Sequence, residues 1–177
     1  MVNTLIVYYS LEGNCEFIAN TIAQEIGCPI QRLIAKDSPD PNKFSKYFWG
    51  GKQVLMKVKP ELEVLSKNPE EFDLIILGTP VWASTYSPAI RSFISQSRLS
   101  GKYIALFCCH EGGKGKTLEK LEQELRGNTV VGKIDFIAPL KENKKNPGHK
   151  EKCRTIAQAW ADEVYSKVKL AKEDRFV

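Results

Sequence analysis

Residues 5–15 read Leu-Ile-Val-Tyr-Tyr-Ser-Leu-Glu-Gly-Asn-Cys, a combination that can bind an anion. An apolar, strand-like segment leads into a hydroxyl at Ser10, a single glycine at Gly13 and an asparagine at Asn14, and a helical pattern begins at once. The first backbone N–H groups of a helix lack intrahelical partners, and the helix dipole favours negative charge there. Gly13 lets the backbone approach a phosphate, while Ser10 and Asn14 can donate hydrogen bonds. This turn therefore predicts a phosphate site.

Other known phosphate loops differ from this turn. The chain lacks the P-loop spacing Gly-x-x-x-x-Gly-Lys-Ser/Thr and has only one of the three glycines of the dinucleotide fingerprint. A low-molecular-weight tyrosine phosphatase needs a Cys nucleophile and an Arg, where this chain has Tyr8 and Thr21. Because residues 1–31 contain no Lys or Arg, we expect dipoles and neutral donors to hold the phosphate without a salt bridge. An ordinary β–α turn is the alternative.

Two later segments carry further features of a ligand site. Residues 78–88 are stiffened by two prolines and include Trp82 and Tyr86, large aromatics at a strand-to-helix turn. Residues 109–115 hold three glycines within four positions, which lets backbone lie flat against a ligand. Ligands of parallel sheets bind beyond the carboxyl ends of the strands, so these segments are expected to meet the first turn. Together they predict a site for a flat, phosphorylated heteroaromatic molecule, with core packing as the alternative for Trp82.

Apolar segments of strand length alternate with helical patterns along the chain. The expected strands are residues 5–9, 29–34, 74–78, 103–108 and 130–137. The expected helices are residues 15–26, 44–54, 89–95, 118–125 and 152–170. This alternation predicts a parallel sheet covered by helices on both faces. No internal repeat or linker divides residues 1–177, so we predict a single domain, with an unusually long connection at residues 35–68.

The composition excludes several classes of protein. With 42% hydrophobic residues, 27% charged residues and a net charge of +5, the chain is typical of a soluble globular protein. It has no apolar run of membrane-spanning length, and a strand begins too early for a signal peptide. Five scattered cysteines without Cys-x-x-Cys spacing indicate reduced thiols in a cytoplasm rather than a zinc site or a disulfide framework. The lysine-rich segments lack interleaved aromatics, so an acidic partner is a better candidate for them than nucleic acid.

With these three loops in one chain, the sequence resembles the flavodoxin-like family of FMN-binding proteins over most of its length. The resemblance implies an α/β three-layer sandwich whose five-stranded parallel sheet has the order 2-1-3-4-5. It also implies FMN as the cofactor, with the first loop around the phosphate and the other two around the isoalloxazine ring. No catalytic residue and no metal ligand is expected. The cofactor-binding residues expected on this basis are Ser10, Leu11, Glu12, Gly13, Asn14, Cys15, Thr79, Pro80, Val81, Trp82, Ala83, Tyr86, Cys109, His110, Glu111, Gly112 and Gly113.

The phosphate loop departs from the common flavodoxin pattern at two positions. Threonines are usual where this chain has Glu12 and Cys15, so two hydroxyl donors are missing, and the Glu12 carboxylate must point away from the phosphate. The Cys15 thiol, at a helix N-terminus, is expected to lie against the phosphate and to be protected by it, with a merely small residue at the start of the helix as the alternative. The chain is also basic, whereas electron carriers of this family are usually acidic.

Two functions follow from the resemblance. The first is a low-potential electron carrier between redox partners, which we favour because no residue set outside the flavin loops looks catalytic. The second is an NAD(P)H-dependent FMN quinone reductase, in which Lys114 and Lys116 are candidates for binding a phosphate of the pyridine nucleotide. His110 is expected to be a polar filler. The expected partners are redox proteins or a small electron acceptor, and the expected state is a cytoplasmic monomer or weak dimer; a binding module without flavin is a third alternative.

Overall fold

Strands and helices alternate along the chain in the computed structural model, which describes residues 1–36, 59–142 and 146–174. The expected helix at residues 44–54 lies outside the described residues. The elements are β1 (Thr4–Tyr8), α1 (Asn14–Ile26), β2 (Ile30–Arg32), the short 3-10 helix η1 (Pro69–Glu71), β3 (Leu74–Trp82), β4 (Thr85–Tyr86), α3 (Pro88–Gln96), β5 (Tyr103–His110), α4 (Thr117–Glu124), β6 (Thr129–Ile137) and α5 (His149–Glu173).

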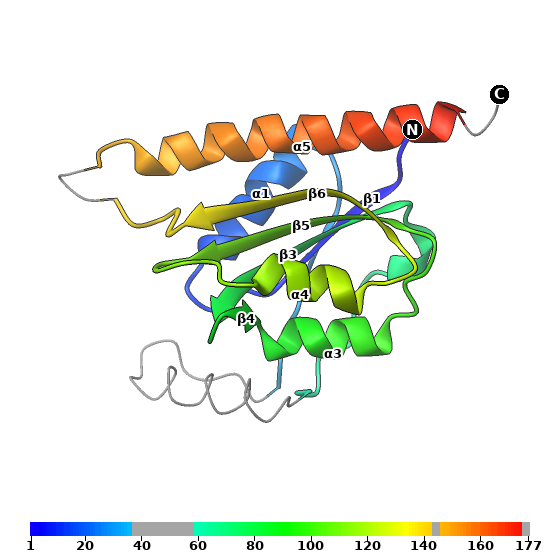
Figure 1. Ribbon diagram of the computed structural model, residues 1–177, viewed down its shortest axis with the longest axis horizontal. Coiled ribbons are helices and arrows are strands. Elements are labelled where there is room, and N and C mark those ends of the chain that lie inside the picture. The colour runs from blue at the N-terminus through cyan, green and yellow to red at the C-terminus, as the bar shows by residue number, and fades with distance from the viewer. Residues whose placement is uncertain (37–58, 143–145, 175–177) are drawn as a thin grey trace.

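The sheet has the order β2-β1-β3-β5-β6, and every neighbouring pair along this path is parallel. Helices α1 and α5 cover one face of the sheet, and α3 and α4 cover the other (Figure 1). The predicted α/β sandwich and its strand order are therefore confirmed. The two-residue strand β4, which pairs antiparallel with the end of β3, was not expected.

Alternate residues of the central strands form two separate cores. Ile76 and Phe107 belong to the core beneath α1 and α5, whereas Leu77 and Leu106 belong to the core beneath α3 and α4. All four side chains are fully buried, which explains why these strands are almost continuously apolar in sequence. Gly78 leaves room for the Phe107 ring, since a Cβ atom built at Gly78 would lie only 2.0 Å from it.

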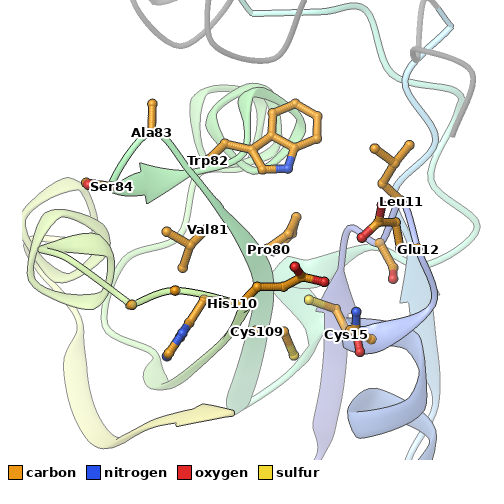
Figure 2. A pocket seen from close by; sticks show the side chains of 15 residues that line it. Leu11, Glu12, Cys15, Pro80, Val81, Trp82, Ala83, Ser84, Cys109 and His110 are labelled. Atoms are coloured by element: carbon orange, nitrogen blue, oxygen red, sulfur yellow. The ribbon is translucent and has the colours of Figure 1, made fainter. Parts of the chain in front are cut away.

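Two strands extend beyond their expected ends. Strand β3 continues past Gly78 to Trp82, and β5 continues past Cys108 to His110. The extension of β3 contains Pro80, which has its strand neighbour on the β5 side alone because β1 ends opposite Gly78. Proline is tolerated at such an edge position. The two extensions carry residues of the predicted loops up to the rim of the cavity shown in Figure 2.

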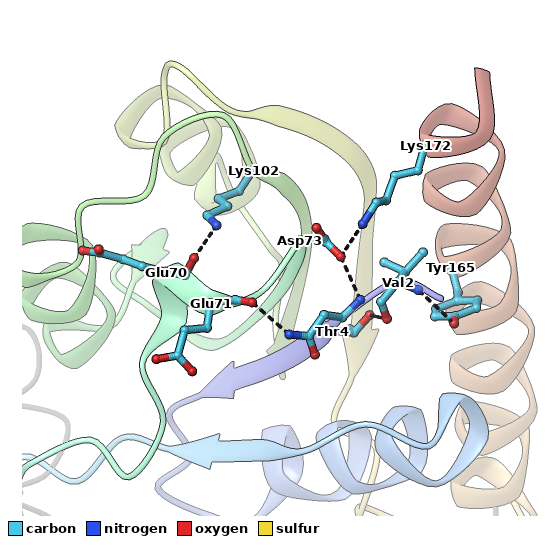
Figure 3. Close-up of polar contacts among 9 residues, drawn as sticks. Val2, Thr4, Glu70, Glu71, Asp73, Lys102, Tyr165 and Lys172 are labelled. Carbon is cyan, nitrogen blue, oxygen red and sulfur yellow. Dashed lines mark hydrogen bonds and ion pairs between the residues drawn. The ribbon is translucent and has the colours of Figure 1, made fainter. Parts of the chain in front are cut away.

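The opposite edge of the sheet is tied to the end of α5 by a polar network around Asp73 (Figure 3). Its carboxylate accepts a hydrogen bond of 2.9 Å from the backbone N–H of Asn3 and lies 2.6 Å from the Lys172 ammonium group. The backbone N–H of Val2 donates to the Tyr165 hydroxyl on the same helix. These contacts fix the start of β1 to α5. Among the described residues, no helix combines the length and the apolar character needed to cross a membrane.

This network makes stability depend on pH. Burial alone would raise the pKa of Asp73, but the hydrogen bonds from Lys172 and Asn3 outweigh it and lower the pKa below the usual value. The folded protein therefore keeps this carboxylate ionised where the unfolded chain, with a pKa of about 3.9, binds a proton. The stabilisation is complete above that unfolded pKa and is lost as the pH falls through the lower folded value.

We expect Asp73→Asn to lower the free energy of unfolding at pH 7 by about 0.5–1 kcal/mol, because the pair is partly exposed and screened by solvent. The difference from the wild type should shrink below about pH 4. Denaturant unfolding at several pH values measures it. Glu163→Gln, which breaks the exposed pair with Lys167 on α5, is the matched control and should change stability less. A pH-independent effect of Asp73→Asn would contradict the electrostatic explanation.

Candidate functional site

A cavity of about 520 Å³ opens at the carboxyl ends of β1, β3 and β5, a size typical of small-molecule sites. Figure 2 shows its wall formed by side chains from three separate segments of the chain. These segments are the three loops singled out in the sequence. The lining residues are Ser10, Leu11, Glu12, Asn14, Cys15, Pro80, Val81, Trp82, Ala83, Ser84, Cys109, His110, Glu111, Gly112 and Gly113.

The first segment brings the N-terminus of α1 to the cavity. Gly13 precedes the helix with a left-handed φ of 86°, a conformation that glycine adopts without steric cost, and as the N-cap residue it has no side chain with which to cap the helix. The first N–H groups of α1 therefore lack the side-chain acceptor that commonly satisfies them. Asn14 and Cys15, the first two helical residues, line the cavity. An uncapped helix start next to a cavity matches the chemistry of a phosphate, so this part of the site fits FMN.

The segment after β6 supports this helix start. The backbone N–H of Leu140 donates to Oδ1 of Asn14 at 3.1 Å, and a Cβ atom built at Gly13 would lie 3.2 Å from the Leu140 side chain. Asn14 was expected only as a donor to phosphate, but its amide oxygen accepts this bond. Sequence reasoning missed Leu140, because no local motif links residues so far apart in the chain.

Arg32, at the end of β2, places a cation behind the first loop. Its guanidinium group lies 3.0 Å from Oε1 of Glu16 and donates to the carbonyl oxygen of Ser10 at 3.4 Å. Burial, together with the nearby Glu16 carboxylate, raises the pKa of Tyr8 to about 12, so this hydroxyl remains protonated. The stretch without Lys or Arg, from which the sequence predicted a phosphate held without a salt bridge, ends one residue before Arg32.

The second segment forms an aromatic wall. Ala83 and Ser84 both have left-handed φ angles, 47° and 58°, and form the tight turn that joins β3 to β4. Two-residue hairpin turns of this kind usually contain Asn or Gly. Here Ala83 and Ser84 adopt the strained conformation instead, and both line the rim of the cavity. The half-buried Trp82 ring lies edge-on to Tyr9, with centroids 5.7 Å apart and an interplanar angle of 88°. Ser84 was not among the predicted site residues.

Three predicted site residues do not line the cavity. Gly13, the residue before α1, is not among the lining residues. Thr79 is fully buried, and its hydroxyl oxygen accepts a 3.0 Å hydrogen bond from the backbone N–H of Ser87. Tyr86 is buried in the core under the guanidinium group of Arg91, 4.9 Å from its ring centroid. Tyr86, expected among the cofactor-binding residues, therefore lies in the core instead, because the turn at residues 83–84 reverses the chain and β4 carries Tyr86 away from the cavity.

The third segment ends in a charged cluster. Nε2 of His110 lies 3.1 Å from one oxygen of Asp135 on β6, and Nζ of Lys114 lies 2.7 Å from the other. Burial alone would raise the pKa of Asp135. The hydrogen bonds from Lys114 and His110 together have the larger effect and lower this pKa below its usual value. Nδ1 of His110 is buried without a hydrogen-bond partner among the described residues. His110 is thus held toward β6, and Lys114 neutralises Asp135.

Cys109 completes the floor of the cavity. Burial raises the pKa of its thiol well above the usual value, and a hydrogen bond with the Cys15 thiol raises it further. Gly112 and Gly113 follow on the rim, and a Cβ atom built at either glycine would meet nothing within 4 Å. Their backbone therefore faces open space that a flat ring can occupy.

Comparisons with solved structures show the same fold. The chain is 22% identical to a flavoprotein from Lactobacillus acidophilus NCFM in complex with FMN, with a TM-score of 0.67 over 76% of this chain and 93% of that one. A flavodoxin, WrbA-like protein from Agrobacterium tumefaciens is 20% identical, with a TM-score of 0.57 over 94% and 99%. Two-electron reduced Megasphaera elsdenii flavodoxin is 22% identical, with a TM-score of 0.51 over 90% and 98%.

The sequence itself identifies the family. No curated protein matches the chain in a sequence search. Residues 3–143, most of the chain and all three segments of the cavity, match the family described as NADPH-dependent FMN reductase. This match and the flavodoxin-like fold support FMN as the cofactor expected from the sequence. The chain belongs to the NADPH-dependent FMN reductase family.

Proposed function

We propose that the protein is an FMN-dependent oxidoreductase that takes electrons from NADPH and passes them to a small acceptor such as a quinone. The observation that carries this proposal is the cavity itself, which joins an uncapped helix N-terminus to an aromatic wall and a glycine-lined rim. The family match adds NADPH as the electron source. Bound FMN supplies a ring that accepts and releases electrons one or two at a time.

Each segment of the cavity has a distinct role in holding this cofactor. The N–H groups of the first turn of α1, with Ser10, bind the phosphate through dipoles and neutral donors. Trp82 packs against the isoalloxazine ring and is itself braced by Tyr9. The backbone at Gly112 and Gly113 borders the other side of the ring. The apolar wall excludes water from the ring, since Pro80 and Val81 line the same cavity.

A second electrostatic feature favours binding of NADPH near the cavity. Lys116 immediately precedes α4, which has no side-chain cap, and Lys120 on that helix donates to the carbonyl oxygen of Ser84 on the rim, at 3.2 Å. The Lys114 charge is compensated by Asp135, so of the two lysines singled out in the sequence we assign Lys116 to the phosphate of the nucleotide.

The electron carrier is the second candidate. It is favoured by the pairing of the ionisable side chains on the third segment. His110 is bound to Asp135, and the Glu111 carboxylate lies 3.3 Å from the Lys141 ammonium group. Neither His110 nor Glu111 is therefore placed as a free acid or base for a reaction on a substrate. In this role a redox protein would take the place of NADPH.

The proposed function also has consequences for the binding partners, the cellular compartment and the oligomeric state of the protein. A small acceptor needs only the open side of the cavity, whereas a protein partner needs the surrounding surface as well. We propose a cytoplasmic location because all five cysteines are free, as is usual in a reducing compartment. A monomer or weak dimer remains our proposal for the oligomeric state.

Reduction by NADPH separates the two candidates. Anaerobic NADPH should bleach the flavin absorbance of the FMN-loaded protein, and addition of a benzoquinone should give continuous NADPH oxidation. Lys116→Gln should raise the KM for NADPH about fivefold at most, the effect of one exposed charge pair, and leave the KM for the quinone unchanged. Lys133→Gln, remote in sequence and paired with Glu122, is the charge-matched control. If NADPH does not reduce the flavin of this protein but a reduced redox protein does, the protein is the electron carrier.

The phosphate site predicts discrimination between flavins. We expect apoprotein to bind FMN at least about tenfold more tightly than riboflavin, because each hydrogen bond to the charged phosphate contributes about 1.5–3 kcal/mol. Isothermal titration with both flavins measures this ratio. Inorganic phosphate should compete with FMN and not with riboflavin. Equal affinities for the two flavins would mean that α1 does not bind the phosphate.

The aromatic wall predicts a stacking contribution. Trp82→Ala should weaken FMN binding by about 1–3 kcal/mol, taking base stacking on aromatic side chains as the nearest analogue. Trp82→Phe should retain part of the affinity, and tryptophan fluorescence should rise when FMN is removed. Tyr86→Phe is the control, since Tyr86 is a buried aromatic outside the cavity. If Trp82→Ala binds FMN normally, Trp82 serves only to pack against Tyr9.

A further inference from the structure

Two cysteine thiols meet at the floor of the cavity. Cys15 comes from the first turn of α1 and Cys109 from the end of β5, and their side chains are 1% and 4% exposed. The two thiols share a hydrogen bond, and both residues line the cavity. Figure 2 shows the two side chains next to each other, below Pro80 in this view. They join the segment assigned to the phosphate with the segment assigned to the ring.

The other cysteines are less well placed to react with either thiol. Cys108 is next to Cys109 in β5 but belongs to the core on the opposite face of the sheet. Cys28 lies beyond the far end of α1. Cys153, on α5, shares the core of Cys15 and Cys109, but its sulfur contacts Nε2 of His149 at 3.7 Å. Cys15 and Cys109 are therefore the pair that the fold has brought together.

We propose that Cys15 and Cys109 form a redox-sensitive pair that a hydroperoxide oxidises to a disulfide when no flavin phosphate occupies the first loop, and that this disulfide weakens FMN binding. The proposal rests on the proposed FMN site. Cys15 and Cys109 are then a site of oxidative modification, which electron transfer itself does not require. The oxidant is hydrogen peroxide or an organic hydroperoxide small enough to enter the cavity.

The reaction proceeds in two balanced steps. The Cys15 sulfur attacks one oxygen of the peroxide, the O–O bond breaks, and the second oxygen leaves as water from hydrogen peroxide or as an alcohol from an organic hydroperoxide, giving a sulfenic acid on Cys15. The Cys109 sulfur then attacks the Cys15 sulfur, the S–S bond forms, and the sulfenic oxygen leaves as water. Two thiols are oxidised to one disulfide, and one hydrogen peroxide is reduced to two waters.

The positions of the two thiols set the order of the steps. Burial keeps the pKa of Cys109 high, so its thiol retains its proton beside the Cys15 sulfur. Cys15 lies in the first turn of α1, next to the part of the cavity assigned to the phosphate. Bound phosphate would bring negative charge to the same turn and cover the sulfur, so FMN is expected to protect the pair.

The disulfide changes the phosphate site because Cys109 is fixed between two strands, whereas Cys15 belongs to the first turn of α1. Cys109 pairs with Pro80 on one side and Phe136 on the other, inside the sheet. Cys15, the second residue of α1, follows the loop of residues 10–13, and this loop belongs to no strand or helix. Two sulfurs must approach to about 2.05 Å to form the bond, so the start of α1 shifts toward β5. The shift moves its N–H groups out of position for a phosphate.

Peroxide treatment of the 177-residue chain tests this. Apoprotein should lose two of its five free thiols, and peptide mapping under non-reducing conditions should find a single cross-link joining Cys15 and Cys109. Saturation with FMN should slow the loss at least tenfold. Oxidised apoprotein should bind FMN at least tenfold more weakly by titration, and dithiothreitol should restore the affinity.

Matched variants keep the test decisive. Cys15→Ser and Cys109→Ser should abolish the cross-link, whereas Cys28→Ser and Cys153→Ser should retain it. The wild-type cross-link can be mapped even if a variant fails to fold. A different cross-link, no cross-link, or an oxidised protein with unchanged FMN affinity would overturn the proposal. Failure of reduced apoprotein to bind FMN would instead contradict the proposed function, and mapping the cross-link would still test the pairing.

Discussion

The uncapped start of α1 is the constraint on which the arrangement of the site depends. A helix that begins without a side-chain cap leaves donors that need an acceptor, and here they face a cavity rather than bulk solvent. The left-handed Gly13, the bond from Leu140 to Asn14 and the cation of Arg32 all hold this helix start in place. The parallel sheet then brings two more loops to the same edge, because its strands end there together.

The charges around the third loop illustrate how a basic chain can keep a nearly neutral site. Lys114 and His110 share the carboxylate of Asp135, and Lys141 lies beside Glu111, so these charges are balanced locally. The net charge of +5 is therefore not concentrated at this loop. This local balance favours binding of an uncharged ring. Lysines outside the balanced cluster, such as Lys116, then provide the longer-range attraction for an anionic electron donor.

Much of the fold was readable from the sequence, because each central strand is apolar on both faces and each connection carries a helical period. The strand order was supplied by the resemblance to flavodoxin-like proteins, and most of the residues expected in the three loops line the cavity. What escaped prediction depends on contacts between distant residues. Leu140 reaches the first loop from beyond β6, Arg32 reaches it from β2, and the β4 hairpin turns Tyr86 into the core. Secondary-structure propensities and the local spacing of residues do not encode contacts between such distant parts of the chain.

The anchoring of α5 at Asp73 has a consequence for attaching other modules. Val2 is bonded to Tyr165, and Lys172 reaches Asp73, so the first described residues and the last turns of α5 lie together at the edge opposite the cavity. A tag, a surface linker or a fused redox domain joined near either end would thus begin on the far side of the sheet from the flavin loops. Direct transfer between fused partners would require a linker long enough to wrap around the domain, whereas immobilisation through either end would leave the cavity facing the solution.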